Sequence, residues 1–120
     1  MNVAYWILAG PLALFYLYSG GIKTVQDRAR LRPMMAWVDA MPMPAVRTIG
    51  AIEVCGAIGL VLPPLTGTAP WLALAAAIGF EALQTAAIGV HLSRGEREIA
   101  LNLTLLAVGA MVIWTATTWL

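Results

Sequence analysis

Four long apolar runs dominate the chain, and shorter segments between them contain most of its polar residues. The runs cover about residues 3–22, 45–62, 70–90 and 99–119. A helix of roughly 20 mostly apolar residues is long enough to cross the hydrocarbon core of a bilayer. None of the runs alternates apolar and polar residues as a membrane β-barrel strand would. The pattern therefore predicts an all-α, polytopic membrane protein, in which residues 1–120 form a single four-transmembrane-helix bundle.

The basic residues between the runs predict how this bundle is oriented. The second connection, residues 63–69, has no basic residue, whereas the first and third connections contain Lys23, Arg28, Arg30, Arg32, Arg94 and Arg97. Connections rich in Lys and Arg stay on the cytoplasmic side of the membrane, so we expect both termini outside. Trp6, Trp71 and Trp119 then fall at the outer interface, where tryptophan is enriched.

The first connection is long, and residues 24–41 mix charged side chains with large apolar ones. Two structures fit this cytoplasmic loop: an amphipathic helix lying on the lipid headgroups, or an irregular loop whose arginines only set the topology. Pro33 would interrupt a continuous helix here, and Pro42 fits a break just before the second crossing. We expect Pro63 and Pro64 to end the second helix sharply.

Composition agrees with a membrane protein and excludes several functions. The 120 residues are 61% hydrophobic and only 11% charged, whereas soluble domains have about 25% charged residues. A net charge of +1 provides no basic field for nucleic acid. The single cysteine, Cys55, cannot form an intrachain disulfide, and no Cys/His cluster suggests a metal site. We expect Cys55 to be a small buried apolar residue.

Two acidic residues interrupt the apolar runs and are the strongest indication of function. Glu53 lies about 12 Å into the second predicted helix and Glu81 about 16 Å into the third. Both depths are close to the midplane of a hydrocarbon core about 30 Å thick. Acidic residues at that depth are costly and usually functional. We expect the two to face each other, with at least one of them protonated at neutral pH.

Other polar residues collect between that level and the cytoplasmic side. On the first helix Tyr16, Ser19, Gly20 and Lys23 form one stripe by their i, i+3, i+4, i+7 spacing. The remaining candidates are Gln84, Thr85 and His91 on the third helix and Asn102 on the fourth. Together they predict a polar pocket that opens toward the cytoplasm. A plainer interpretation also fits: hydrogen bonds between helices, a topology-setting Lys23, a His91 that caps its helix, and glycines that allow close helix contact.

The order of these motifs resembles a known family. The first helix ends in Phe15-x3-Ser19-Gly20-x2-Lys23, and an alanine-rich third helix ends in His91. Between them lies Ile49-Gly50-x2-Glu53-x2-Gly56-Ala57-Ile58-Gly59-Leu60-Val61-Leu62-Pro63. This pattern resembles the DoxX-like family of small four-helix integral membrane proteins. The resemblance implies a four-helix bundle and a place near redox complexes, because relatives include the small subunit of an archaeal thiosulfate:quinone oxidoreductase. Lys23, Glu53 and His91 match positions of the family pattern, and the resemblance implies no specific role for any of them.

Three functions fit these features. The first is a DoxX-like protein of the bacterial inner membrane that binds a lipophilic ligand and is accessory to redox or quinone-linked metabolism, with quinone as the candidate cofactor. In it Tyr16, Ser19, Lys23, Gln84, Thr85 and Asn102 would bind the ligand. The second is a metal-free acid/base enzyme, of isomerase, epoxide hydrolase or cyclase type, with Glu53, Glu81 and His91 as catalytic residues. The third is a membrane scaffold or chaperone.

The same features indicate the partners of the chain. We expect it to contact membrane lipid and a lipophilic small molecule, and not nucleic acid. A second copy of the chain or another membrane protein is the expected macromolecular partner.

Overall fold

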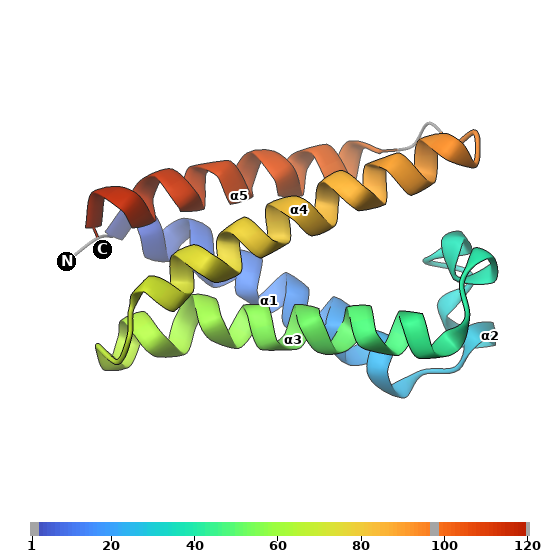
Figure 1. Ribbon diagram of the computed structural model, residues 1–120, viewed down its shortest axis with the longest axis horizontal. Coiled ribbons are helices and arrows are strands. Elements are labelled where there is room, and N and C mark those ends of the chain that lie inside the picture. The colour runs from blue at the N-terminus through green and yellow to red at the C-terminus, as the bar shows by residue number, and fades with distance from the viewer. Residues whose placement is uncertain (1–2, 97–98, 120) are drawn as a thin grey trace.

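A computed structural model describes residues 3–96 and 99–119, and all long elements within them are helices. The four long helices are α1 (Val3–Val25), α3 (Met43–Thr66), α4 (Trp71–Ser93) and α5 (Ala100–Trp119) (Figure 1). Each contains a stretch long and apolar enough to cross a membrane. The predicted all-α, four-helix membrane fold is therefore confirmed.

The helices form a ring in which each long helix packs on two others. α1 lies along α3 with the most extensive contact, α4 packs on both α3 and α5, and α5 closes the ring against α1. The two chain ends lie together at one end of the bundle, and α2 lies at the other end (Figure 1). Four crossings require this arrangement, while the side of the membrane on which the termini lie stays a prediction.

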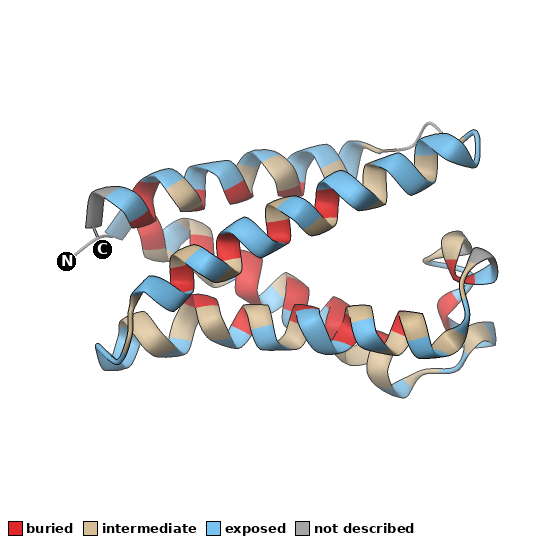
Figure 2. Cartoon of the chain, viewed as in Figure 1, coloured by how far each residue is buried: buried red, intermediate tan, exposed pale blue. Residues whose placement is uncertain are grey.

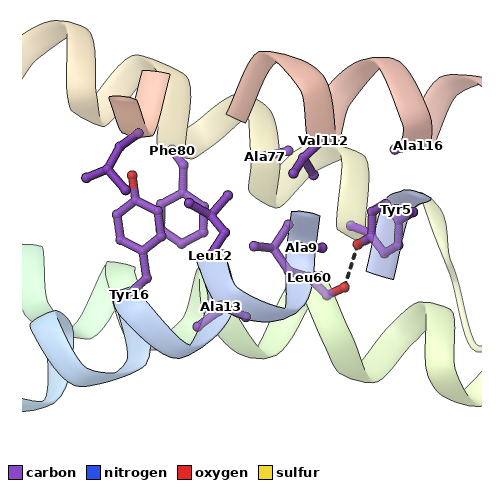
Figure 3. Packing of buried hydrophobic residues seen from close by; sticks show 13 residues of the cluster. Tyr5, Ala9, Leu12, Ala13, Tyr16, Leu60, Ala77, Phe80, Val112 and Ala116 are labelled. Atoms are coloured by element: carbon purple, nitrogen blue, oxygen red, sulfur yellow. Dashed lines mark hydrogen bonds between the residues drawn. The ribbon is translucent and has the colours of Figure 1, made fainter. Parts of the chain in front are cut away.

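The prediction that Pro63 and Pro64 end the second helix is wrong. α3 continues to Thr66 and ends at Gly67, whose φ of 72° is the left-handed conformation that glycine adopts readily. Pro64 has no N–H to donate to the carbonyl of Leu60. The hydroxyl of Tyr5 donates to that carbonyl instead (Figure 3). A side chain from α1 thus replaces the bond that the proline removes, and the helix continues.

Small residues dominate the core in the half of the bundle near the termini. Buried alanines let the helices approach closely, as is usual in lipid. The rings of Tyr16 and Phe80 stack at the centre, with centroids 3.7 Å apart and planes 6° from parallel (Figure 3). A Cβ atom at Gly56 would lie 2.5 Å from the Phe80 ring, so this glycine makes room for the stack. Buried residues are concentrated where the helices cross (Figure 2).

The first connection folds into two short helical turns instead of one amphipathic helix. α2 (Arg28–Leu31) and the 3-10 helix η1 (Ala36–Ala40) lie on either side of Pro33, which separates them as expected. Leu31 of α2 and Val38 of η1 form a small core with Val46 of α3. The guanidinium of Arg28 donates to the carbonyls of Val38 and Met41 and so fastens this loop to itself.

The position of Cys55 differs from the prediction, and two other residues named in the sequence analysis lie wholly or partly outside the description. Cys55 is exposed on the outer face of α3, which corrects its assignment as a buried residue. The apolar character of its run did not identify which side of the helix faces the core. Arg97 and the side chain of Trp119 lie outside the described residues.

Candidate functional site

Two glycines determine how α1 and α3 meet near the loop end of the bundle. A Cβ atom on Gly20 would lie 2.6 Å from the carbonyl oxygen of Gly50, and one on Gly50 would lie 2.7 Å from that of Gly20. The two backbones are therefore in direct contact. A Cβ atom on Gly20 would also lie 2.9 Å from Cβ of Glu53, and one on Gly50 would lie 2.7 Å from Cβ of Lys23. Each glycine thus leaves room for the charged residue of the other helix, and this crossing brings Lys23 and Glu53 together.

Lys23 and Glu53 form a buried ion pair between α1 and α3. Only 9% of the Lys23 side chain and 2% of the Glu53 side chain are exposed. The Lys23 ammonium donates to Oε1 of Glu53, and the Ser19 hydroxyl donates to Oε2 at 3.4 Å. Lys23 therefore points into the bundle. A lysine that only set the topology would point toward the lipid headgroups.

Arg47 fixes the end of α1 beside this pair. Its guanidinium donates to the carbonyl oxygens of Lys23, at 2.8 Å, and of Gln26. Carbonyls at a helix C-terminus lack partners within the helix and attract positive charge. Arg47 thereby allows α1 to continue three residues beyond its predicted end and holds Lys23 in position.

A cavity of about 810 Å³ opens between the α1–α3 pair and the α4–α5 pair. Its volume lies within the range of about 300–1,000 Å³ that small-molecule sites have. The polar residues that line it are Ser19, Lys23, Glu53, Gln84, His91, Glu96 and Asn102. The rest of its wall is apolar, and the loop contributes Met34, Met35, Trp37 and Met41. The cavity lies toward the loop end of the bundle.

A chain of hydrogen bonds links three helices beside the cavity. The Asn102 amide donates to Oε1 of Gln84 at 2.9 Å, and the Gln84 amide donates to the Tyr16 hydroxyl at 2.8 Å. Tyr16 and Gln84 are buried, whereas Asn102 is half-buried at the cavity wall. The chain holds α1, α4 and α5 together and orients the Asn102 side chain in that wall.

Glu81 does not join Glu53, contrary to the expected pair of facing acids. It lies against Gly109 of α5, where a Cβ atom would collide with its Oε1. This oxygen is buried and has no hydrogen-bond partner among the described residues. Glu81 is three residues from Gln84, about 60° away around the helix, and this rotation turns it from the cavity to the α4–α5 contact.

Thr85 also lies away from the cavity. It is exposed, and its hydroxyl donates to the Glu81 carbonyl of its own helix at 2.8 Å. The predicted stripe on this helix was therefore too wide: the cavity includes Gln84 and His91 but neither Glu81 nor Thr85.

Comparison with known families agrees with this architecture. The sequence profile of the DoxX-like family matches residues 7–114, which include parts of all four long helices. The protein belongs to the DoxX-like family. No curated protein and no solved structure matches the chain.

The mouth of the cavity in this DoxX-like protein contains a cluster that the sequence did not reveal. Nδ1 of His91 lies 2.6 Å from Oε1 of Glu96, and Nε of Arg94 donates to Oε2 at 3.2 Å. These bonds, with His91 the larger cause, lower the pKa of Glu96 below its usual value of 4.5. Gly95, with a φ of 77°, turns the chain so that Glu96 folds back on His91. The Arg94-Gly95-Glu96 sequence after a helix was the available signal.

The loop residues of the cavity were also missed as site residues. Trp37 lies beneath the Lys23 ammonium, 5.4 Å from its ring centroid, a distance at which cation and ring attract. The signal was the run of methionines around Trp37, since flexible thioethers suit irregular apolar surfaces. Within residues 3–96 and 99–119, no three His, Cys, Asp or Glu side chains are placed to hold a metal ion.

Proposed function

We propose that this DoxX-like protein binds a lipophilic molecule with a small polar head group, of the quinone type, in the cavity between its two helix pairs. In this proposal it serves as an accessory component of redox metabolism in a bacterial inner membrane. The observation that carries the proposal is the buried Lys23–Glu53 ion pair at the wall of a mostly apolar cavity. Charged residues at membrane depth that face a bundle interior usually mark a ligand or ion pathway.

The free hydrogen-bonding groups of the cavity support a carbonyl-bearing head group. A lysine ammonium has three N–H donors. Within the described residues, the Lys23 ammonium donates to Glu53 and lies over the Trp37 ring, which leaves N–H donors for a ligand. The Asn102 amide has a second N–H beyond the one that Gln84 accepts. Quinone carbonyls are planar acceptors that fit such donors, and the redox complexes of DoxX-like relatives favour this class.

Topology supports access from the cytoplasmic side of the membrane. The cavity mouth lies at the end where Arg28, Arg32 and Arg94 are found, and basic connections are typical of the cytoplasmic side. The proposed orientation, with both termini outside, follows from the same residues. A fusion of a fluorescent reporter to the C-terminus would fluoresce poorly in a bacterial periplasm if this orientation is right.

The test uses menadione, a naphthoquinone without a side chain, and the fluorescence of Trp37 in lipid nanodiscs. We expect saturable quenching in the natural protein and loss of its saturable part in Trp37→Phe. The double variant Lys23→Met/Glu53→Leu removes both charges together, which avoids leaving one charge buried alone. We expect it to fold and to bind menadione about tenfold more weakly or worse.

A matched control is available in the exposed ion pair of the loop. Arg32 and Asp39 are 2.9 Å apart and do not line the cavity, so Arg32→Met/Asp39→Leu should bind menadione like the natural protein. The proposal fails if the folded Lys23→Met/Glu53→Leu variant binds menadione with unchanged affinity, or if the natural protein gives no saturable quenching. Native mass spectrometry of the extracted protein, with a retained lipophilic molecule, would identify the natural ligand.

No observation favours the acid/base enzyme over ligand binding. That hypothesis depended on two carboxyl groups that converge, and Glu81 lies against Gly109 instead. A scaffold function would leave the Lys23–Glu53 pair as a purely structural contact. It therefore predicts that partner capture, and not menadione binding, responds to changes on the outer helix faces.

A further inference from the structure

A second, apolar groove runs along the seam between α1 and α5. It has a volume of about 280 Å³ and is lined by Ile7, Pro11 and Val108 among others. The seam faces outward, because α1 and α5 are the two helices that close the ring. In a membrane this groove opens to the hydrocarbon of the lipid.

The groove and the polar cavity share two wall residues, Phe15 of α1 and Leu105 of α5. The cavity extends from these residues toward the loop end, where Lys23 lies. The groove extends from them in the opposite direction, along two turns of α1 from Phe15 to Ile7, a distance of about 12 Å. Phe15 is half-buried and Leu105 is buried, so the side chains of these two residues form the boundary between the two spaces.

We infer that the ligand is an amphiphile with a hydrocarbon chain, and that this chain leaves the cavity between Phe15 and Leu105 and lies in the α1–α5 groove. The inference rests on the proposed function, since it assigns a place to the tail of the molecule whose head group binds near Lys23. An amphiphile needs a polar site for its head group and an apolar one for its chain, and the two spaces differ in this way. The cavity wall includes the Lys23–Glu53 ion pair, whereas every residue that lines the groove is apolar.

The membrane environment explains why such a groove is useful. A chain that moves from lipid into an apolar groove gains packing contacts but almost no hydrophobic free energy, because lipid is equally apolar. The groove therefore does not need to trap the tail tightly. It allows the head group to occupy the cavity while the tail stays in contact with the bilayer.

The experiment uses a 2-methyl-1,4-naphthoquinone whose saturated side chain has a photoreactive diazirine near its far end. After irradiation in nanodiscs, mass spectrometry maps the labelled residues. We expect the labels to be concentrated on residues 7–15 of α1 and 105–108 of α5, and excess long-chain naphthoquinone without diazirine to compete for them. Labels spread evenly over the outer faces of all four helices would overturn the inference.

A blocked groove provides a second measurement. Val108→Trp fills the groove and should reduce groove labelling about tenfold or more, while menadione, which has no chain, still quenches Trp37. Ile78→Trp is the matched control, because Ile78 is exposed on α4 away from the groove. If Val108→Trp folds poorly, Ile7→Trp at the exposed far end of the groove replaces it.

The two proposals fail in different ways. Absence of saturable menadione quenching in the natural protein would refute the head-group site. Normal menadione quenching, together with groove labelling that Val108→Trp and Ile7→Trp leave unchanged, would refute only the path of the tail.

Discussion

Gly20 of α1 and Gly50 of α3 lie backbone to backbone, with no room for a Cβ atom on either. We predict that Gly20→Ala and Gly50→Ala each lower the free energy of unfolding by about 1–3 kcal/mol, the usual cost of overpacking. The variants should also separate Lys23 from Glu53 and weaken menadione binding. Thermal unfolding in a mild detergent measures the first effect and Trp37 quenching the second.

Gly10 and Gly21 provide the control for this prediction. Both lie in α1, and a Cβ atom on either would meet nothing within 4 Å. Gly10→Ala and Gly21→Ala should therefore leave stability unchanged or raise it by up to about 1 kcal/mol, because alanine favours helix. Equal destabilisation by all four substitutions would show that the crossing is not specifically tight.

Gly109 provides the space that the Glu81 carboxyl group occupies. We predict that Gly109→Ala is destabilising, and that the cost is reduced when Glu81 is also replaced by alanine, because the collision then disappears. A double-mutant cycle should give a coupling energy of about 0.5–3 kcal/mol. Gly79→Ala on α4, where a Cβ atom meets nothing, is the control and should show no coupling with Glu81→Ala.

The orientation of Glu81 marks the limit of what the sequence could predict. Four helices followed from the length of four apolar runs. The stripe from Tyr16 to Lys23 followed from its helical spacing, and the structure buries all its members on one face. On α4, however, apolar residues surround the helix on every side, and such a helix has no hydrophobic face that reveals its rotation. The contact of Glu81 depends on α5, and nothing in the sequence around Gly109 indicates that this glycine would make room for a carboxyl group of another helix.

The sequence could predict a helix end only where residues of that helix alone determine it, without contacts from other segments. Pro63 and Pro64 suggested an end to the second helix, but Tyr5, more than fifty residues away, supplies the missing donor. Similarly, α1 continues to Val25 because Arg47 caps it from another helix. Contacts between distant segments thus explain both differences.

The Lys23–Glu53 ion pair should be costly to break from one side. We predict that Lys23→Met or Glu53→Gln alone destabilises the protein by about 3–5 kcal/mol, because each change leaves the other group buried without its partner. The double variant Lys23→Met/Glu53→Leu should recover most of this loss. Chemical or thermal unfolding of the three variants checks the order, and a double variant as unstable as the sum of the single ones would contradict it.

The Glu96 cluster should make stability depend on pH at the acidic end. The pKa of Glu96 is lowered in the folded protein, so folding favours its charged form. The resulting stabilisation is fully present above the unfolded pKa of about 4.5 and is lost as the pH falls through the lower folded value. We predict that Glu96→Gln lowers Tm near neutral pH and that the difference from the natural protein disappears in acid. A Tm difference that is constant with pH would contradict this assignment.

Tyr5 and Pro64 should be energetically coupled through the carbonyl of Leu60. Tyr5→Phe removes the hydroxyl that donates to this buried carbonyl, and an unsatisfied buried group costs about 1–3 kcal/mol. In a Pro64→Ala background the backbone N–H of residue 64 is restored and can supply the bond, so Tyr5→Phe should then cost much less. Thermal unfolding of the four proteins of this cycle measures the difference. The same cycle with Pro63→Ala, whose restored N–H would serve Gly59 instead of Leu60, should leave the cost of Tyr5→Phe undiminished. Equal rescue by both alanine substitutions would mean that the tyrosine hydroxyl does not replace the bond that Pro64 removes.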